Sequence, residues 1–176
     1  MRRTRLAAVA AATGALTALA GASISSAAPS SGTVMMLDAC DPATFNAAIG
    51  EGTCERPGGG VTLDSFIGQL LTHGTAPSWR FSGPATVAAG GTLTAVNRGG
   101  EFHTFTKVAA FGGGCVDVLN ELLGLTPVPE CAQAPGIFFT TGAGMGGSVT
   151  TPPLAAGTHR FLCLIHPWMT STVTAK

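Results

Sequence analysis

The sequence predicts an all-β exported domain with a small helical extension before it and a short helical insertion within it. Only 10 % of the residues are charged and 25 are glycine, a composition that suits strands joined by turns. Apolar and polar residues alternate in several short runs, whereas helical spacing of apolar residues is confined to two segments. The first residues also have the composition of an export signal.

Residues 1–27 predict a secretory signal peptide. A basic start precedes an Ala/Leu/Val-rich run, and small residues precede the expected cleavage site after Ala27. The basic residues are Arg2, Arg3 and Arg5. Because a signal peptide directs export, we expect the mature protein to be secreted.

Charge and hydropathy limit the partners of the mature chain. Removing three of the nine basic residues and none of the nine acidic ones leaves a net charge of 6 minus 9, or −3. This balance gives no reason to expect a nucleic acid or an anionic membrane as partner. No later apolar run has the length of a membrane span. We expect a monomer of about 149 residues, which is enough for one domain.

Residues 28–81 are predicted to form an extension that packs on the β domain. Val34–Leu37 is apolar and is either an added strand or an anchor, and a cysteine-bounded loop follows it. Next comes a helix that Thr62 caps and His73 ends. Its helical spacing is carried by Leu63, Phe66, Ile67, Leu70 and Leu71.

Residues 82–176 are predicted to form the main domain. Alternating or β-rich runs predict strands, the first of which begins at Trp79. These strands are expected at 79–82, 86–88, 92–96, 103–108, 137–141, 147–151, 158–162 and 169–174. Between the fourth and fifth strands, helical spacing predicts a short helix over Val116, Leu119, Leu122 and Leu123.

Five cysteines in an exported chain form an odd set. Local pairing predicts the disulfides Cys40–Cys54 and Cys115–Cys131, although four cysteines allow three connectivities. Each bridge closes a loop that contributes about 3 kcal/mol in the chain-entropy model. The pairing leaves Cys163 over, and a metal ion is the simplest protection for an exported thiol.

The leftover cysteine lies in a segment with the ligands of a mononuclear copper site. Cys163, His166 and Met169 supply a thiolate, an imidazole and a thioether within seven residues, directly after a predicted strand. Such a site needs a thiolate, two imidazoles and a weak axial thioether. The second imidazole is expected from His103, which opens an alternating segment. Two strands would then hold one copper ion.

These segments carry a resemblance to a known family. Asn97–His103 followed by Gly157–Met169 resembles the type I copper signature of the cupredoxins, and the Cys-x-x-His-Pro-x-Met loop is most similar to the short amicyanin- or plastocyanin-like loop. The resemblance covers residues 82–176. It implies a cupredoxin-like Greek-key β-sandwich that carries single electrons on one copper ion, cycling between Cu(I) and Cu(II), with ligands His103, Cys163, His166 and Met169.

The resemblance also implies a residue beside the site and a partner surface. The family usually carries Asn after the first histidine; Thr104 stands there, and its hydroxyl can still hydrogen-bond to the cysteine loop. His166 would present its ring edge to a transient redox protein partner, because small apolar patches suit brief encounters. Ile165, Pro167 and Trp168 would form the patch around it. An alternative prediction is that Trp168 is buried under the loop.

Other histidines and methionines have simpler interpretations. His159 shares a strand face with Phe161, so it is expected inside the β domain, hydrogen-bonded and away from the metal. Met145 lies in a glycine-rich turn that could approach the metal end, but Met169 has the better spacing for a ligand.

Other functions remain open at this point. The same four ligands suit copper storage or delivery, the domain could be a non-catalytic interaction module, and thiolate with imidazole also suits zinc. An enzyme is not expected. A multicopper oxidase needs His-x-His pairs that the sequence lacks, and a hydrolase using Cys163 lacks a nearby carboxylate to orient its histidine.

Overall fold

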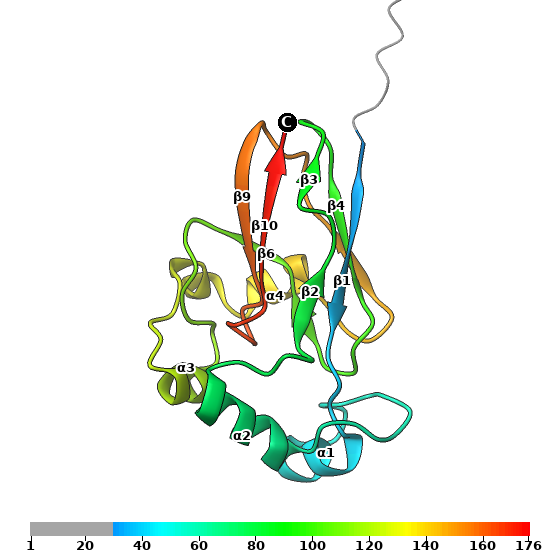
Figure 1. The fold of residues 1–176 in the computed structure, drawn as a ribbon, viewed down its shortest axis with the longest axis vertical. Coiled ribbons are helices and arrows are strands. Elements are labelled where there is room, and N and C mark those ends of the chain that lie inside the picture. The colour runs from blue at the N-terminus through cyan, green and yellow to red at the C-terminus, as the bar shows by residue number, and fades with distance from the viewer. Residues whose placement is uncertain (1–29) are drawn as a thin grey trace, which may run out of the picture.

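Figure 1 shows two facing β-sheets, with the helices α1 (Pro42–Ile49), α2 (Leu63–His73) and α3 (Asp117–Leu123) at one end of the molecule. The structure is a computed structural model, and it describes residues 30–176. The predicted signal peptide, residues 1–27, lies outside the described residues. Residue 30 and the C-terminus both lie at the end opposite the helices α1 and α2 (Figure 1).

The first sheet has four strands in the order β2-β1-β4-β8. The chain first enters β1 (Gly32–Leu37), which pairs in parallel with β4 (Leu93–Asn97) and antiparallel with β2 (Arg80–Ser82). The outer strand β8 (Ser148–Thr150) pairs antiparallel with β4. The added strand considered for Val34–Leu37 is therefore present, and residues 28–81 contribute β1 and β2 to this sheet. The division at 81/82 stays a prediction.

The second sheet has the order β3-β10-β9-β6. Its central strands β9 (Gly157–Leu162) and β10 (Thr170–Ala175) pair antiparallel. They are flanked by β6 (Thr106–Val108) and by β3 (Thr86–Val87), which runs parallel to β10. The predicted strands at both ends of the Cys163 loop are thus confirmed, and the Greek-key connection stays a prediction.

The strand predicted over 103–108 is divided in two. Its first part, β5 (His103–Thr104), leaves the second sheet and pairs with β7 (Gly142–Ala143). Its second part is β6, which stays in the sheet. Phe105 lies at the break with its side chain buried, and its N–H donates to the Thr141 carbonyl at 2.7 Å. This break turns His103 towards the end of the sandwich.

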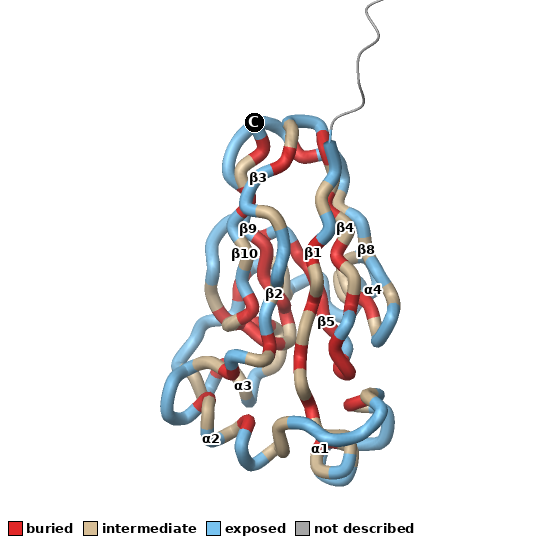
Figure 2. The backbone as a smooth tube through the Cα atoms, turned by 45° about the vertical axis from the view of Figure 1, so that its right-hand side comes forward, coloured by how far each residue is buried: buried red, intermediate tan, exposed pale blue. Residues whose placement is uncertain are grey.

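An apolar core fills the space between the two sheets. Inward-facing residues of both sheets are almost fully buried, as the red segments of the strands in Figure 2 show. Phe105 stacks on Phe161 with ring centroids 4.2 Å apart. The cluster contains Val34, Met36, Val87, Leu93, Ala95, Phe105, Ala143, Leu154, Phe161, Val173 and Ala175. This arrangement is a two-sheet β-sandwich, as predicted.

Three helices cover one end of the sandwich. The loop closed by Cys40–Cys54 holds α1 (Pro42–Ile49), which the sequence analysis did not predict. The predicted helices are α2 (Leu63–His73) and α3 (Asp117–Leu123). As expected, the Thr62 side chain accepts from the Ser65 N–H, and α2 ends at His73 because Gly74 takes a left-handed conformation with φ of 67°.

The strand predicted over 137–141 is wrong, because α4 (Gly136–Thr141) is a helix. Aromatic and β-branched residues favoured a strand, and a short apolar run leaves helix and strand hard to distinguish. Ile137 and Phe138 both pack against the cluster of Val108, Val128, Leu162 and Leu164. Adjacent residues of a strand point to opposite faces, so this packing requires a helical turn.

The remaining connections agree with the sequence analysis. Both predicted disulfides, Cys40–Cys54 and Cys115–Cys131, are present. The second one joins the start of the insertion to a short 3-10 helix, η1 (Pro129–Gln133). Among residues 30–176, no helix combines the length and apolar character that crossing a membrane requires.

Candidate metal centre

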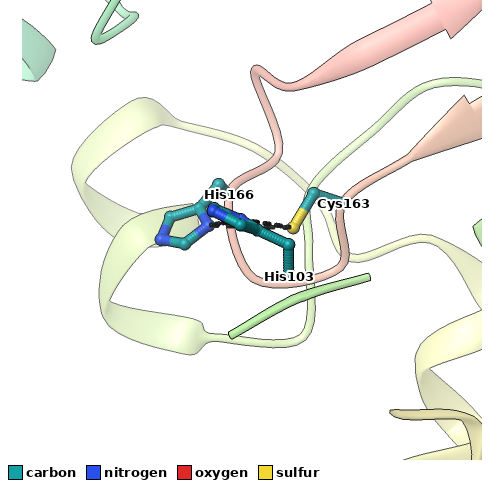
Figure 3. A group of neighbouring side chains, drawn as sticks. All are labelled: His103, Cys163 and His166. Atoms are coloured by element: carbon teal, nitrogen blue, oxygen red, sulfur yellow. Dashed lines mark hydrogen bonds between the residues drawn. The ribbon is translucent and has the colours of Figure 1, made fainter. Parts of the chain in front are cut away.

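The site is built from one strand and one loop at the helical end of the sandwich. His103 opens β5, and Cys163 follows the last residue of β9. The loop is closed by two backbone hydrogen bonds, in which Cys163 N–H donates to the Met169 carbonyl at 3.0 Å and Met169 N–H donates to the His166 carbonyl at 2.9 Å. This closure places the His166 ring beside both the Cys163 sulfur and the His103 ring (Figure 3).

Three donor atoms converge on one point. The Cys163 Sγ lies 3.9 Å from His103 Nδ1 and 3.7 Å from His166 Nδ1, and the two Nδ1 atoms are 3.2 Å apart. The point equidistant from them is therefore about 2.1 Å from each, whereas metal–imidazole and metal–thiolate bonds are about 2.0–2.3 Å long. The triangle has the dimensions of a trigonal metal site.

Two buried carboxylates orient the imidazoles. His103 Nε2 lies 2.8 Å from Asp38 Oδ2, and His166 Nε2 lies 3.6 Å from Glu101 Oε2. A carboxylate only accepts hydrogen bonds, so the Nε2–H of each imidazole faces its carboxylate and each Nδ1 faces the Cys163 sulfur. The three donor atoms therefore face one point. Carboxylate–imidazole pairs of this kind are usual around metal-bound histidines.

The electrostatics of the cluster favour a thiolate. Burial raises the pKa of the Cys163 thiol, but hydrogen bonds and charges from His103 and His166 outweigh burial and lower that pKa well below its usual value. Burial lowers the pKa of His166, whereas Cys163 and Glu101 raise it, to about 10. The deprotonated sulfur is the form that binds metals, and metal binding displaces protons from the imidazoles.

Asp38 is held as a carboxylate by several donors. Burial raises its pKa, but hydrogen bonds from His103 and from the backbone of Glu101, Gly100 and Cys40 lower it by more, to about 2. A Cβ on Gly99 would overlap the Asp38 carboxylate, so the glycine allows this close approach. Asp38 is therefore a fixed negative charge behind His103.

Thr104 links β5 to the cysteine loop. The hydrogen bond predicted between its hydroxyl and the loop is present. Its Oγ1 accepts from the Leu164 N–H at 2.8 Å, and its own N–H donates to the Cys163 Sγ at 3.5 Å. Hydrogen bonding to the sulfur is one of the factors that tune a metal–thiolate centre. The residue therefore fixes the position of the thiol from two directions.

Met169 is buried at the end of the loop, in the same apolar cluster as Cys163. Its backbone makes both loop-closing hydrogen bonds, and it directly precedes β10. Its position is compatible with an axial thioether, and that role stays a prediction. Met145, the alternative thioether, is 46 % exposed in its turn.

The patch predicted around His166 is largely buried, and its role as a partner surface stays a prediction. His166 is 2 % exposed and Pro167 is also buried. Trp168 is half-buried, with its ring 5.5 Å from that of His166 and 5.6 Å from that of Phe66 on α2. The cause is the helical cover, because α2 lies over the loop that would otherwise face solvent. Ile165 is partly exposed and, like His166, lines an apolar groove.

The other histidines lie where the sequence placed them. His159 is buried on β9, and its Nε2 bonds the Ala155 carbonyl at 2.7 Å. His73 is the exposed last residue of α2. Neither histidine joins the cluster of His103, Cys163 and His166. A second group of possible metal ligands among residues 30–176 contains Cys40, whose sulfur is in a disulfide.

Sequence reasoning missed Asp38 and Glu101. A usable signal was present in both cases, since Glu101 lies two residues before His103 and Asp38 lies two before the half-cystine Cys40. Charged residues are scarce in this chain, so acidic residues next to such motifs are worth testing as buried partners. What the sequence could not show was the parallel pairing of β1 with β4, which brings Asp38 to the site.

Fold and site together define a two-sheet β-sandwich with a buried His–Cys–His cluster at its helical end. No family model matches the chain, and no curated protein matches it. A solved structure described as a novel purple cupredoxin from Nitrosopumilus maritimus is 12 % identical and has a TM-score of 0.39, covering 82 % of this chain and 98 % of that one. A structure of a reduced amicyanin mutant is 22 % identical with a TM-score of 0.32, covering 52 % and 67 %. Because both TM-scores are below 0.5, the function is inferred from the site's own geometry.

Proposed function

We propose that this chain is an exported type I copper protein that carries single electrons between redox partners. The observation that carries the proposal is the buried triangle of Cys163 Sγ, His103 Nδ1 and His166 Nδ1, whose centre lies at bond distance from all three atoms. A soft thiolate with two imidazoles is the donor set of a blue-copper centre. Copper bound there would supply the Cu(I)/Cu(II) couple.

The residues of the chain support such a role by holding the donors in place. His103 is fixed by Asp38, and Cys163 is fixed by the Thr104 N–H. The loop hydrogen bonds fix His166. Donors that cannot move keep one geometry in both oxidation states, so little rearrangement opposes electron transfer. Burial of all three donors also limits the access of water to the site.

Copper addition to the mature protein tests the proposal directly. We expect one equivalent of Cu(II) to produce an intense visible thiolate-to-copper band that Cys163→Ala abolishes. The reduction of the band by a one-electron donor and its recovery on reoxidation should be reversible. An intact protein that takes up no copper, or that retains zinc and gives no band with copper, contradicts the proposal.

The thioether role is tested by a matched pair of substitutions. Met169→Leu should shift the visible spectrum and raise the reduction potential, because the axial ligand tunes the potential of a blue-copper centre. Met145→Leu makes the same change at a residue that is 46 % exposed, and should shift neither. Equal spectra for both variants and the parent protein would show that Met169 is not a ligand.

Copper storage or delivery is a second candidate, favoured by one observation. His166 is 2 % exposed, so its ring edge is not open to a flat protein partner. Rapid copper exchange with a chelator, combined with slow reduction by redox proteins, would favour this role. Slow exchange and fast reduction would favour the electron carrier.

We also propose that the protein is a non-enzymatic, secreted monomer. The Cys163 side chain is fully buried, whereas a nucleophilic cysteine needs access to its substrate. The two disulfides suit an oxidising compartment. Sedimentation of the mature chain and detection in the culture medium test the oligomeric state and the location.

A further inference from the structure

An apolar groove lies between the three helices that cover the metal end. It has a volume of about 590 Å³, within the range of small-molecule sites, which is about 300–1,000 Å³. Each helix contributes apolar side chains to its walls. The wall residues are Phe45 and Ile49 of α1, Leu63, Phe66 and Ile67 of α2, and Val118, Leu119 and Leu122 of α3.

Two polar side chains of the metal centre also line this groove. They are Glu101 and His166, which are 7 % and 2 % exposed. Glu101 also accepts a hydrogen bond from the Trp79 indole N–H, which fixes the position of the carboxylate. The groove therefore combines apolar walls with a buried carboxylate beside a candidate metal ligand.

The shape of the groove selects a small occupant. His166 is 2 % exposed and lines the groove, so its ring is within reach of a molecule small enough to enter the groove. Ile49 and Val118 also line the groove and are 59 % and 67 % exposed, which leaves apolar side chains facing solvent. Exposed apolar residues around a groove are typical of a binding site. A narrow apolar molecule fits both observations.

The chemistry of the lining selects the class of that molecule. Phe45 and Phe66 form an edge-to-face pair with centroids 5.5 Å apart, and such rings favour an aromatic body. The Glu101 carboxylate accepts hydrogen bonds, so the occupant needs a donor such as a hydroxyl. Little else in the walls is polar, so a highly charged molecule would lose its hydration without compensation.

We propose that the groove between α1, α2 and α3 binds a small phenol or hydroquinone, with a hydroxyl on Glu101 and the ring among the apolar walls. The choice of a reducing phenol over another aromatic donor rests on the proposed electron-transfer function, whereas the binding itself does not. In this proposal the three helices form a binding site that brings an organic molecule to the edge of the His166 ring.

Binding is tested by NMR titration of the mature protein with trimethylhydroquinone under anaerobic conditions. Copper-free and Cu(I)-loaded samples are used, because neither can oxidise the probe. We expect saturable shifts of the groove residues and of the indole N–H signals of Trp79 and Trp168, which lie beside Glu101 and His166. The dimethyl ether of the probe, which has no donor, should bind at least about tenfold more weakly.

Three variants define where the probe binds. Leu122→Ser removes an apolar wall residue and should weaken binding severalfold. Leu71→Ser makes the same change on α2 at a residue that is 65 % exposed and outside the groove, and should change nothing. Glu101→Gln replaces a charged acceptor by a neutral one and should weaken the hydroquinone about tenfold while leaving the ether unchanged.

Each contrary result overturns a defined part of the proposal. Absence of saturable shifts, or equal weakening by Leu122→Ser and Leu71→Ser, overturns the site. Equal affinity for the hydroquinone and its ether overturns the contact with Glu101. Because the titration is read without Cu(II), failure to bind copper leaves its result valid, and failure to bind the probe leaves the copper proposal intact.

Discussion

The interior of the sandwich and its helical end bury different kinds of side chain. The space between the sheets is filled by hydrocarbon from both of them, including Phe105 stacked on Phe161. The helical end buries His103, His166, Asp38 and Glu101 beside the free thiol. Burying apolar surface stabilises a fold directly, whereas burying polar groups costs free energy unless each finds a partner. The helical end combines these polar groups with an apolar cluster of its own, which includes Phe45, Phe66, Leu70 and Trp79.

The largest expected contrast is between two buried histidines. His103→Ala removes a candidate ligand and should weaken copper binding more than about a hundredfold, since loss of even an outer contact costs about 10–100-fold. His159→Ala removes a histidine that is also buried but bonds the Ala155 carbonyl instead of facing the thiol. Copper affinity measured by competition with a chelator should be unchanged in that variant. Equal losses in both variants would contradict the assignment of His103 as a ligand.

The reverse contrast is expected for the apolar core between the sheets. Phe161→Ala should reduce the free energy of unfolding by about 3–5 kcal/mol, because it opens a cavity in the core. Urea unfolding of the metal-free protein measures this loss. The copper band of the folded variant should keep its position, since Phe161 lies outside the donor triangle. A shifted band would mean that the core and the site are coupled.

The stability that Asp38 contributes to the helical end should depend on pH. Its pKa of about 2 in the folded protein, against 3.8 ordinarily, contributes about 2 kcal/mol of stability. Because the folded pKa is the lower one, this contribution is present above about pH 4 and is lost as the pH falls towards 2. Asp38→Asn should therefore destabilise the metal-free protein at about pH 7 and progressively less at about pH 3. A difference independent of pH would contradict the charge-based explanation.

The smallest effect is expected for the two tryptophans near the site. Trp79 donates its indole N–H to Glu101, whereas the Trp168 Nε1 is buried without a hydrogen-bond partner. Replacement of Trp79 by Phe leaves the Glu101 carboxylate without its donor and should cost about 1–3 kcal/mol. Trp168→Phe should cost less in the same urea experiment. The opposite order would show that the indole bond does not stabilise this end.

The sequence predicted most strands and three residues that meet at the candidate site, for identifiable reasons. Alternation marked β4, β9 and β10, and the odd cysteine with its nearby histidine marked the loop. These signals are local, so they are visible in one segment at a time. The placement of Asp38 depends on a pairing between residues about sixty positions apart, and no local pattern contains it. The same applies to the helical cover, which buried His166 against expectation.

Both ends of the described chain lie at the pole opposite α1 and α2 (Figure 1). An affinity tag or an electrode linker attached after Lys176 would hold the molecule with its helices turned outward. Immobilised protein should then remain reachable by small molecules in solution, while the support itself stays distant from the metal centre. This orientation makes surface attachment through the C-terminus a practical format for studying the site.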